Sequence, residues 1–164
     1  MPGDKPHRVL VTGSRDWPDA GRIRGELSAL ADQHPEGLIV VHGDARRGAD
    51  RMASDWARSR RNDGRRVAEE AHPADWARHG GHSGFLRNAA MVSLGADECL
   101  CFVVPCSQRY CRRPQPHGSH GATMCAKLAR EAHIPVSVFA ENGEPWEALF
   151  PGVLSKSVSG SAAE

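Results

Sequence analysis

Glycine, serine, arginine and aspartate gather in two short segments whose composition is typical of phosphate-binding turns. Residues 12–16 read TGSRD, and residues 42–50 read HGDARRGAD. Gly13 permits a tight turn, while Ser14 and Arg15 add side-chain donors to the backbone N–H groups that such a turn exposes. Neither the Gly-Lys-Ser/Thr of a P-loop nor the GxGxxG of a dinucleotide fingerprint is present. We expect both segments to face a phosphate, with an ordinary strand-to-helix turn as the simpler alternative.

Two further segments have the same polar, glycine-containing character. Residues 72–76 read HPADW and precede a glycine-rich stretch, and residues 119–123 read SHGAT directly before a predicted helix. Trp76 offers a stacking face for a base, although a single Trp is more often a core residue. Four such segments favour a nucleotide-sized polar pocket. The predicted ligand-binding residues are Gly13, Ser14, Arg15, Gly43, Asp44, Gly48, Asp50, Asp75, Arg87, Asn88, Ser119 and Gly121.

The roles expected within this pocket follow from side-chain chemistry. Arg15 and the glycine backbones would hold phosphates, and Asp44 and Asp50 would accept hydrogen bonds from a ribose or hold a metal-bound water. Asp50 fits equally well as a first-turn residue that complements a helix dipole. His42 is a candidate acid, base or phosphate contact, but no pattern in the sequence selects a catalytic residue.

A proline-broken insertion, residues 105–120, contains a separate set of soft ligands. Zinc binds such sets of two cysteines and two histidines, although the usual CxxC spacing is absent and a metal-free loop is the alternative. Cys99 or Cys101 could replace His120 as the fourth ligand. No other cofactor is indicated. The candidate ligands of a structural zinc ion are Cys106, Cys111, His117 and His120.

Alternating apolar segments predict the elements that would position these residues. The predicted strands are 8–12, 38–42, 65–71, 98–104 and 135–139; the predicted helices are 19–33, 83–94, 121–132 and one that begins after residue 48. In the predicted helix at 83–94 we expect Leu86, Ala89 and Ala90 to be buried. The alternation predicts a three-layer, Rossmann-like α/β fold with a mostly parallel five-stranded sheet and helices on both faces. Ligands of such sheets bind at the carboxyl ends of the strands, where the four polar segments lie.

Length and composition narrow the organisation and the partners. A chain of 164 residues fits one domain, which we place at 8–150 between a flexible N-terminus, 1–7, and a disordered Ser/Ala/Gly-rich tail, 151–164. The net charge of +1 disfavours a nucleic-acid or membrane partner. No segment provides the ~20 apolar residues of a membrane helix. The five cysteines, odd in number and confined to residues 99–125, indicate reduced thiols or metal ligands. Because the sequence shows neither a targeting segment nor a membrane helix, we expect a cytoplasmic location.

Several segments in this order resemble the YspA-like, YpsA-related branch of the SLOG superfamily, which is named for the SMF/DprA and LOG proteins. The resemblance covers about residues 8–140. It implies a Rossmann-like fold and a pocket for nucleotides or nucleotide-derived ligands, including relatives of NAD and ADP-ribose, held by the residues predicted above. The matching segments are VLVTGSRDW (9–17), VHGDARRGADRMA (41–53), HPADW (72–76), GFLRN (84–88) with Met91, and SHGAT (119–123).

The chain departs from this resemblance at one informative position. LOG phosphoribohydrolases carry a Gly-Thr-x-x-Glu motif whose glutamate is needed to break the N-glycosidic bond, and here Cys125 stands at that place. A hydrolase would therefore need another acid or base, such as Asp44, Asp50 or Asp75. Single-stranded nucleic-acid binding of the DprA type is the rival function, with arginine pairs as contacts. SLOG relatives often self-associate, so a homo-oligomer is a further expectation.

Overall fold

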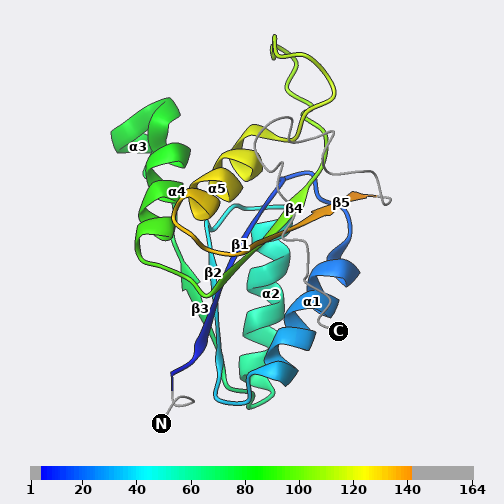
Figure 1. Ribbon diagram of the computed structural model, residues 1–164, viewed down its shortest axis with the longest axis vertical. Coiled ribbons are helices and arrows are strands. Elements are labelled where there is room, and N and C mark those ends of the chain that lie inside the picture. The colour runs from blue at the N-terminus through cyan, green and yellow to red at the C-terminus, as the bar shows by residue number, and fades with distance from the viewer. Residues whose placement is uncertain (1–4, 142–164) are drawn as a thin grey trace, which may run out of the picture.

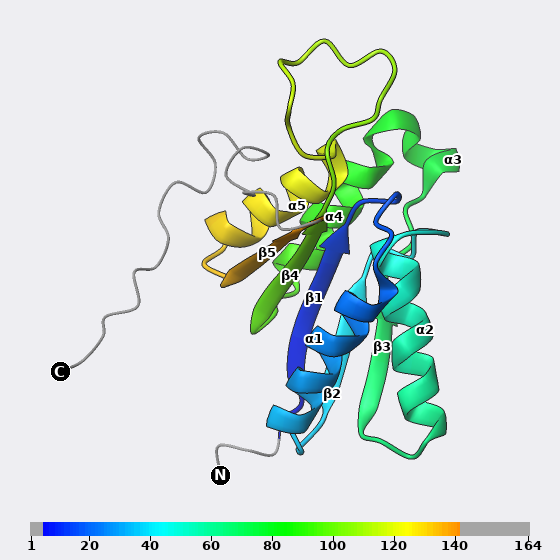
Figure 2. The same cartoon turned by 90° about the vertical axis from the view of Figure 1, so that its right-hand side faces the viewer.

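The computed structural model describes residues 5–141, which form a five-stranded parallel sheet with helices on both faces (Figures 1 and 2). The strand order is β3-β2-β1-β4-β5, and each pair of neighbouring strands is parallel. The predicted Rossmann-like fold class is therefore confirmed. The strands are β1 (His7–Gly13), β2 (Leu38–His42), β3 (Val67–Ala71), β4 (Glu98–Val103) and β5 (Val136–Ala140).

Two helices cover each face of the sheet. Figure 2 shows α1 and α2 on one side and α4 and α5 on the other. The glycine-rich stretch before α4, predicted as a loop, contains a four-residue helix, α3, and a 3-10 turn, η1. The helical segments are α1 (Ala20–Gln33), α2 (Ala49–Asn62), α3 (Trp76–His79), η1 (Gly80–His82), α4 (Ser83–Ser93) and α5 (His120–Glu131).

The central strands are buried on both faces, which explains why their sequences do not alternate between apolar and polar residues. In β1, Val9 and Val11 pack against the α1 and α2 side of the sheet, whereas Leu10 packs toward α4 and α5. The first side contains two buried tryptophans, Trp17 and Trp56. The sheet is thus a rigid platform between two apolar layers.

Helix α4 buries a different face from the one that the sequence predicts. Leu86 and Ala90 are exposed and Ala89 is only half-buried, whereas Met91 and Val92 are buried. The buried face also contains Ser83 and Asn88, because these polar side chains bond inward to backbone carbonyls. Internal hydrogen bonds therefore decide which side of this helix faces the protein.

The strand order creates a switch point between β1 and β4. The chain leaves β1 toward β2 and β3, and later returns to β1's other side as β4. Ligands of open parallel sheets bind beside such a point. The insertion between β4 and α5 projects from the same edge of the sheet (Figure 1).

Some predictions concern residues outside 5–141. The predicted tail, 151–164, lies outside the described residues, as do positions 1–4 and 142–150. None of the helices within residues 5–141 combines the length and apolar character needed to cross a lipid bilayer.

Candidate functional site

A cavity of about 520 Å³ lies at the carboxyl edge of the sheet. Its walls come from the loops after β1, β2 and β4, and from α3, η1 and the first turns of α4 and α5. Pockets for small molecules and cofactors have volumes of roughly 300–1,000 Å³, so this cavity is large enough for a nucleotide.

Nine of the twelve predicted ligand-binding residues line the cavity: Gly13, Ser14, Arg15, Gly43, Asp50, Arg87, Asn88, Ser119 and Gly121. The other three do not. Asp44 is exposed outside the cavity, and Asp75 caps α3 by accepting a hydrogen bond from the Arg78 N–H. Gly48 is buried behind the lining, where it packs against the backbone of the loop after β1.

Ser14 joins the two strands that flank the switch point. Its N–H donates to the Phe102 carbonyl at 2.8 Å, and its Oγ accepts a hydrogen bond from the Val104 N–H at 3.0 Å. The Ser14 and Ser119 hydroxyls are also hydrogen-bonded at 2.5 Å. The loops after β1 and β4 are therefore fixed relative to each other at the cavity floor.

Gly48 allows the loops after β1 and β2 to touch through their backbones. Its φ is +76°, and a Cβ built on it would lie 2.3 Å from the Ser14 carbonyl oxygen. No other residue type fits this combination of left-handed backbone and close approach. Gly48 thus shapes the cavity without lining it.

Two helices begin at the cavity and direct partial positive charge toward it. Asp50, in the first turn of α2, lines the cavity, as do His120, Gly121 and Ala122 of α5. The cap residues Gly48 and Ser119 make no side-chain hydrogen bond to the first-turn N–H groups. Helix N-termini of this kind bind phosphates and other anions.

Three arginines add full positive charges to the cavity lining. Arg47 forms an ion pair with Asp16 at 3.3 Å. The Arg15 guanidinium lies 5.8 Å from the centre of the Trp76 ring, a cation–π distance. Arg87 donates hydrogen bonds to the carbonyls of Gly43 and His72 and to the Asn88 side chain, so its charge is held in one position.

Asp50 is a buried carboxyl group in the cavity wall. Burial raises its pKa, while the positive charge of Arg87 and a hydrogen bond from the Ala45 N–H act in the opposite direction. This hydrogen bond reaches Oδ2 over 3.3 Å. A carboxyl group with a raised pKa in a cleft is a candidate proton donor or acceptor.

Two residues considered for chemistry point away from the cavity. His42 is fully buried, donates from Nε2 to Glu69 at 2.8 Å, and accepts the Asp44 N–H on Nδ1 at 3.0 Å. Both ring nitrogens are therefore used in structural hydrogen bonds. Cys125, at the position of the LOG glutamate, is also fully buried, and burial raises the pKa of its thiol to about 11.

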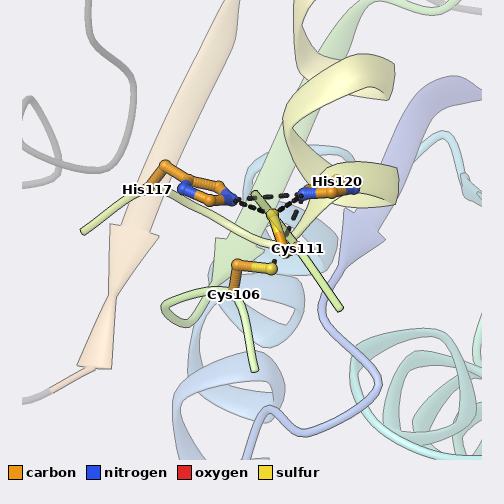
Figure 3. A group of neighbouring side chains, drawn as sticks. All are labelled: Cys106, Cys111, His117 and His120. Atoms are coloured by element: carbon orange, nitrogen blue, oxygen red, sulfur yellow. Dashed lines mark hydrogen bonds between the residues drawn. The ribbon is translucent and has the colours of Figure 1, made fainter. Parts of the chain in front are cut away.

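The four candidate zinc ligands lie together at the base of the insertion (Figure 3). One ligand atom from each of Cys106, Cys111, His117 and His120 lies within 4.8 Å of the other three. Cys99 and Cys101 are fully buried in β4 and belong to the core instead. Of the three residues considered as the fourth ligand, the fold brings His120 to the group.

The sequence did not single out several residues that line the cavity. Pro105, Ser107 and Gln108 do so because the insertion folds back over the sheet edge, and Ser107 Oγ donates to Asp16 at 3.1 Å. Phe85 lines it from α4. No sequence spacing reports where an insertion folds back, so these contacts could not have been predicted.

Comparisons with known proteins agree with this architecture. Residues 7–79, from β1 to α3, match the profile of the YspA, cpYpsA-related SLOG family. The chain is 43% identical over 135 residues to the "Gene 61 protein" of Mycobacterium phage D29, an alignment that covers 82% of this chain and 97% of that protein. The relative's name states no activity. No solved structure matches the chain significantly.

Proposed function

This chain belongs to the YspA, cpYpsA-related SLOG family, and from that premise we propose that it binds a nucleotide or nucleotide-derived small molecule at the carboxyl edge of its sheet. Membership of this family suggests a nucleotide-related ligand. The compounds that we favour are NAD, ADP-ribose and nucleoside phosphates, bound by a sensor or processing protein.

The observation that carries the proposal is the composition of the cavity wall. Two helix N-termini and the guanidinium groups of Arg15, Arg47 and Arg87 face one volume of about 520 Å³. Within residues 5–141, the carboxylates that line it are Asp16 and Asp50, and Arg47 already pairs with Asp16. An excess of donors and positive charge over negative charge is what a phosphate or pyrophosphate group requires.

Two aromatic residues and an amide in the cavity lining support binding of a base or a ribose. Trp76 and Phe85 both line it, and about half of each side chain is exposed. Exposed aromatic rings next to an anion site provide stacking surfaces for a heterocycle. Asn88 also lines the cavity, and its amide group can exchange hydrogen bonds with ligand hydroxyl groups.

A thermal-shift panel of NAD, ADP-ribose and nucleoside mono- and diphosphates tests the proposal. A ligand at a hundredfold excess over its Kd adds about 2.7 kcal/mol to the free energy of unfolding, a clear rise in Tm. We expect at least one compound to stabilise the wild type and Arg15→Ala to lose most of that shift, because Arg15 lines the cavity. The unliganded Tm of the variant should hardly change, since Arg15 is exposed.

Arg24→Ala is the matched control, because Arg24 is an exposed arginine on α1 outside the cavity lining. It should respond to the same compound as strongly as the wild type does. The proposal fails if no compound stabilises the protein, or if Arg15→Ala and Arg24→Ala respond equally.

A second candidate function, hydrolysis of a glycosidic or phosphate bond in the ligand, is favoured by Asp50. Of the three aspartates considered as an acid or base, Asp50 alone lines the cavity, and burial raises its pKa. Chromatography after incubation with each stabilising compound separates binding from turnover. A hydrolase should release product, and Asp50→Asn should stop the release without abolishing the thermal shift.

Single-stranded nucleic acid is less well supported than a small ligand. The arginine pair at 46–47 follows β2 and the pair at 112–113 lies in the insertion. The pair at 60–61 lies in the last turn of α2, and the pair at 65–66 lies between α2 and β3. In a parallel sheet these connections are at opposite edges, so the pairs form no continuous basic track. Oligonucleotide binding with a steep salt dependence would reverse this preference.

A further inference from the structure

Four ligand atoms from the insertion and from the start of α5 converge on one point. His117 Nε2 lies 3.2 Å from His120 Nε2 (Figure 3). Cys111 Sγ lies 3.4 Å from both of these nitrogens, and Cys106 Sγ lies 3.6 Å from His120 Nε2. The two remaining pairs are also within 4.8 Å.

These separations match the edges of a zinc-centred tetrahedron. Zinc bonds of about 2.3 Å to sulfur and about 2.05 Å to nitrogen give edges of about 3.3 Å between nitrogens and about 3.6 Å between sulfur and nitrogen. The four separations given above differ from these values by about 0.2 Å or less. The separations of the ligand atoms therefore suit a tetrahedral metal ion.

A second contact sets the correct tautomer of one ligand. His117 is buried, and its Nδ1 donates a hydrogen bond to the Pro114 carbonyl at 2.8 Å. With the proton on Nδ1, Nε2 carries the lone pair that a metal requires. This partner comes from the insertion itself, three residues before the ligand.

The backbone at the base of the insertion brings the ligands together. Cys106 N–H donates to the His117 carbonyl at 2.7 Å, and Ser119 N–H donates to the Val104 carbonyl at 3.1 Å. These bonds place Cys106 opposite His117. His120 is the first residue of α5, so a shared metal would join the insertion to that helix.

The insertion has little apolar packing of its own. Its single aromatic side chain, Tyr110, is 86% exposed, and residues 107–110 and 112–116 are all exposed. A segment without a buried apolar face depends on cross-links for its conformation. A metal ion would supply such a link.

A second group of potential ligands, His7, His34 and Glu98, provides a contrast. The two imidazole rings stack face to face with centroids 3.7 Å apart. His7 Nε2 pairs with Glu98 at 2.7 Å and His34 Nδ1 with Glu36 at 2.9 Å, so a carboxylate already occupies one nitrogen of each ring. This group is held by contacts with carboxylates, whereas the cysteine and histidine group is held by contacts among its own four side chains and by the Pro114 carbonyl.

We propose that Cys106, Cys111, His117 and His120 bind one structural Zn²⁺ ion that clamps the insertion to α5. Two thiolates and two neutral imidazoles make a neutral complex with Zn²⁺, and this soft ligand set excludes Mg²⁺ and Ca²⁺. All four positions are filled by protein, which is the pattern of a structural rather than a catalytic site. Because Cys106 and His120 also line the cavity, the ion would fix one of its walls.

Metal analysis of untagged protein tests the site. Inductively coupled plasma mass spectrometry should find about one zinc ion per chain, as four protein ligands around one ion require. The Cys106→Ser/Cys111→Ser variant should lose this zinc, while the control His79→Gln, which changes an exposed histidine on α3, should keep it. Circular dichroism establishes that each variant is folded.

Cobalt substitution gives a readout that needs no variant. Wild-type protein stripped of metal and loaded with Co²⁺ should show the intense visible bands of tetrahedral cobalt and a thiolate-to-metal charge-transfer band. The proposal is wrong if untagged protein contains less than a tenth of an equivalent of zinc and cobalt produces neither band. A Cys106–Cys111 disulfide in the freshly purified, metal-free protein would also overturn it.

Limited trypsin digestion tests the clamp separately from nucleotide binding. Arg109 and Arg112 are exposed cleavage sites within the insertion. Removing zinc with a chelator should speed cleavage there by about tenfold or more, because the loop then opens locally. Equal rates with and without zinc would show that the ion does not hold the insertion. This result would leave the nucleotide proposal unaffected.

Discussion

Asp50 illustrates at the residue scale how burial couples a functional group to stability. It lines the cavity and is 7% exposed, so its charged form lacks most of the water that would stabilise it. The hydrogen bond from the Ala45 N–H compensates for part of this loss. The buried Asp50 carboxylate therefore lowers the stability of the folded protein, and buried ionisable groups of this kind are typical of functional sites.

Asp50→Asn should raise the Tm at pH 7 by roughly 2–4 °C. The folded protein holds the Asp50 proton more tightly than the unfolded chain does, because burial raises the pKa. The contribution of Asp50 to wild-type stability should therefore fall as the pH rises above its unfolded pKa of 3.8. The asparagine that replaces Asp50 does not ionise, so the variant does not lose stability in this way. Calorimetry from pH 3 to 7 should show the difference in Tm between variant and wild type shrinking as the pH falls.

Asp55→Asn is the matched control for this experiment. Asp55 lies on the same helix, is exposed, and forms an i,i+4 ion pair with Arg51 at 3.0 Å. Exposed pairs contribute little to stability, so its Tm should follow that of the wild type at each pH. An Asp50→Asn protein less stable than wild type at pH 7 would contradict the assignment of a raised pKa.

At the scale of the elements, alanine substitutions at three loop glycines distinguish residues needed for ligand binding from residues needed for packing between loops. Gly43→Ala should lower the free energy of unfolding by about 1–2 kcal/mol, because the new Cβ meets the Arg87 guanidinium at 2.4 Å and would displace this long side chain from its hydrogen bonds. Displacing Arg87 should nevertheless weaken the nucleotide-induced thermal shift. Gly48→Ala should lower the free energy of unfolding by about 3 kcal/mol or more, because the Cβ meets the Ser14 backbone.

Gly64 supplies the control for backbone conformation. Its φ is +77°, nearly that of Gly48, but no atom lies within 4 Å of a Cβ built on it. Gly64→Ala should lower the free energy of unfolding by about 1 kcal/mol, the strain of the left-handed conformation alone. Urea unfolding measures all three variants, and equal losses at Gly48 and Gly64 would refute the close packing of the two loops.

Most elements, and part of the site, were predictable from the sequence. The β2 bounds were predicted without error and the other strand bounds within two residues, because buried parallel strands and amphipathic helices have distinct apolar periods. The cavity residues next to Gly13 and Gly43 followed from the rule that ligands bind at strand ends. The buried face of α4 did not, because the inward hydrogen bonds of Ser83 and Asn88 outweigh the apolar pattern.

Two glutamates on β3 link an edge strand to the rest of the molecule. Hydrogen bonds from Arg8 lower the pKa of Glu70 to about 2. At Glu69 burial acts to raise the pKa, but hydrogen bonds from Ser54, Arg58 and His42 outweigh it and lower the value to about 2. Since β3 pairs only with β2 among the described strands, these side chains add polar attachments to β1 and α2 beside the apolar packing of Val67.

The whole molecule should therefore lose stability in acid between about pH 4.5 and pH 2. Both carboxylates bind protons less readily when folded than when unfolded, so they stabilise the protein above pH 4.5 and cease to do so near pH 2. Glu69→Gln/Glu70→Gln should lower the free energy of unfolding at pH 7 by roughly 2–4 kcal/mol and flatten the pH profile.

Urea unfolding at pH 7, 4 and 2.5 measures this profile. Glu131→Gln is the control, because Glu131 is exposed and its Lys127 partner is 4.0 Å away. The free energy of unfolding of this variant should change with pH as steeply as that of the wild type. If the free energy of unfolding of Glu69→Gln/Glu70→Gln falls in acid as steeply as that of the wild type, other groups govern acid unfolding.

The hydrogen bond between Ser14 and Ser119 also bears on how the molecule folds. It joins residues 105 positions apart, whereas the β1, β2 and β3 pairings need much shorter loops. Closing a longer loop costs more chain entropy, so contacts at the cavity floor form after the first three strands have paired. During synthesis, the ribosome must release nearly the whole domain before the cavity exists, and any ligand can therefore bind only to the finished fold.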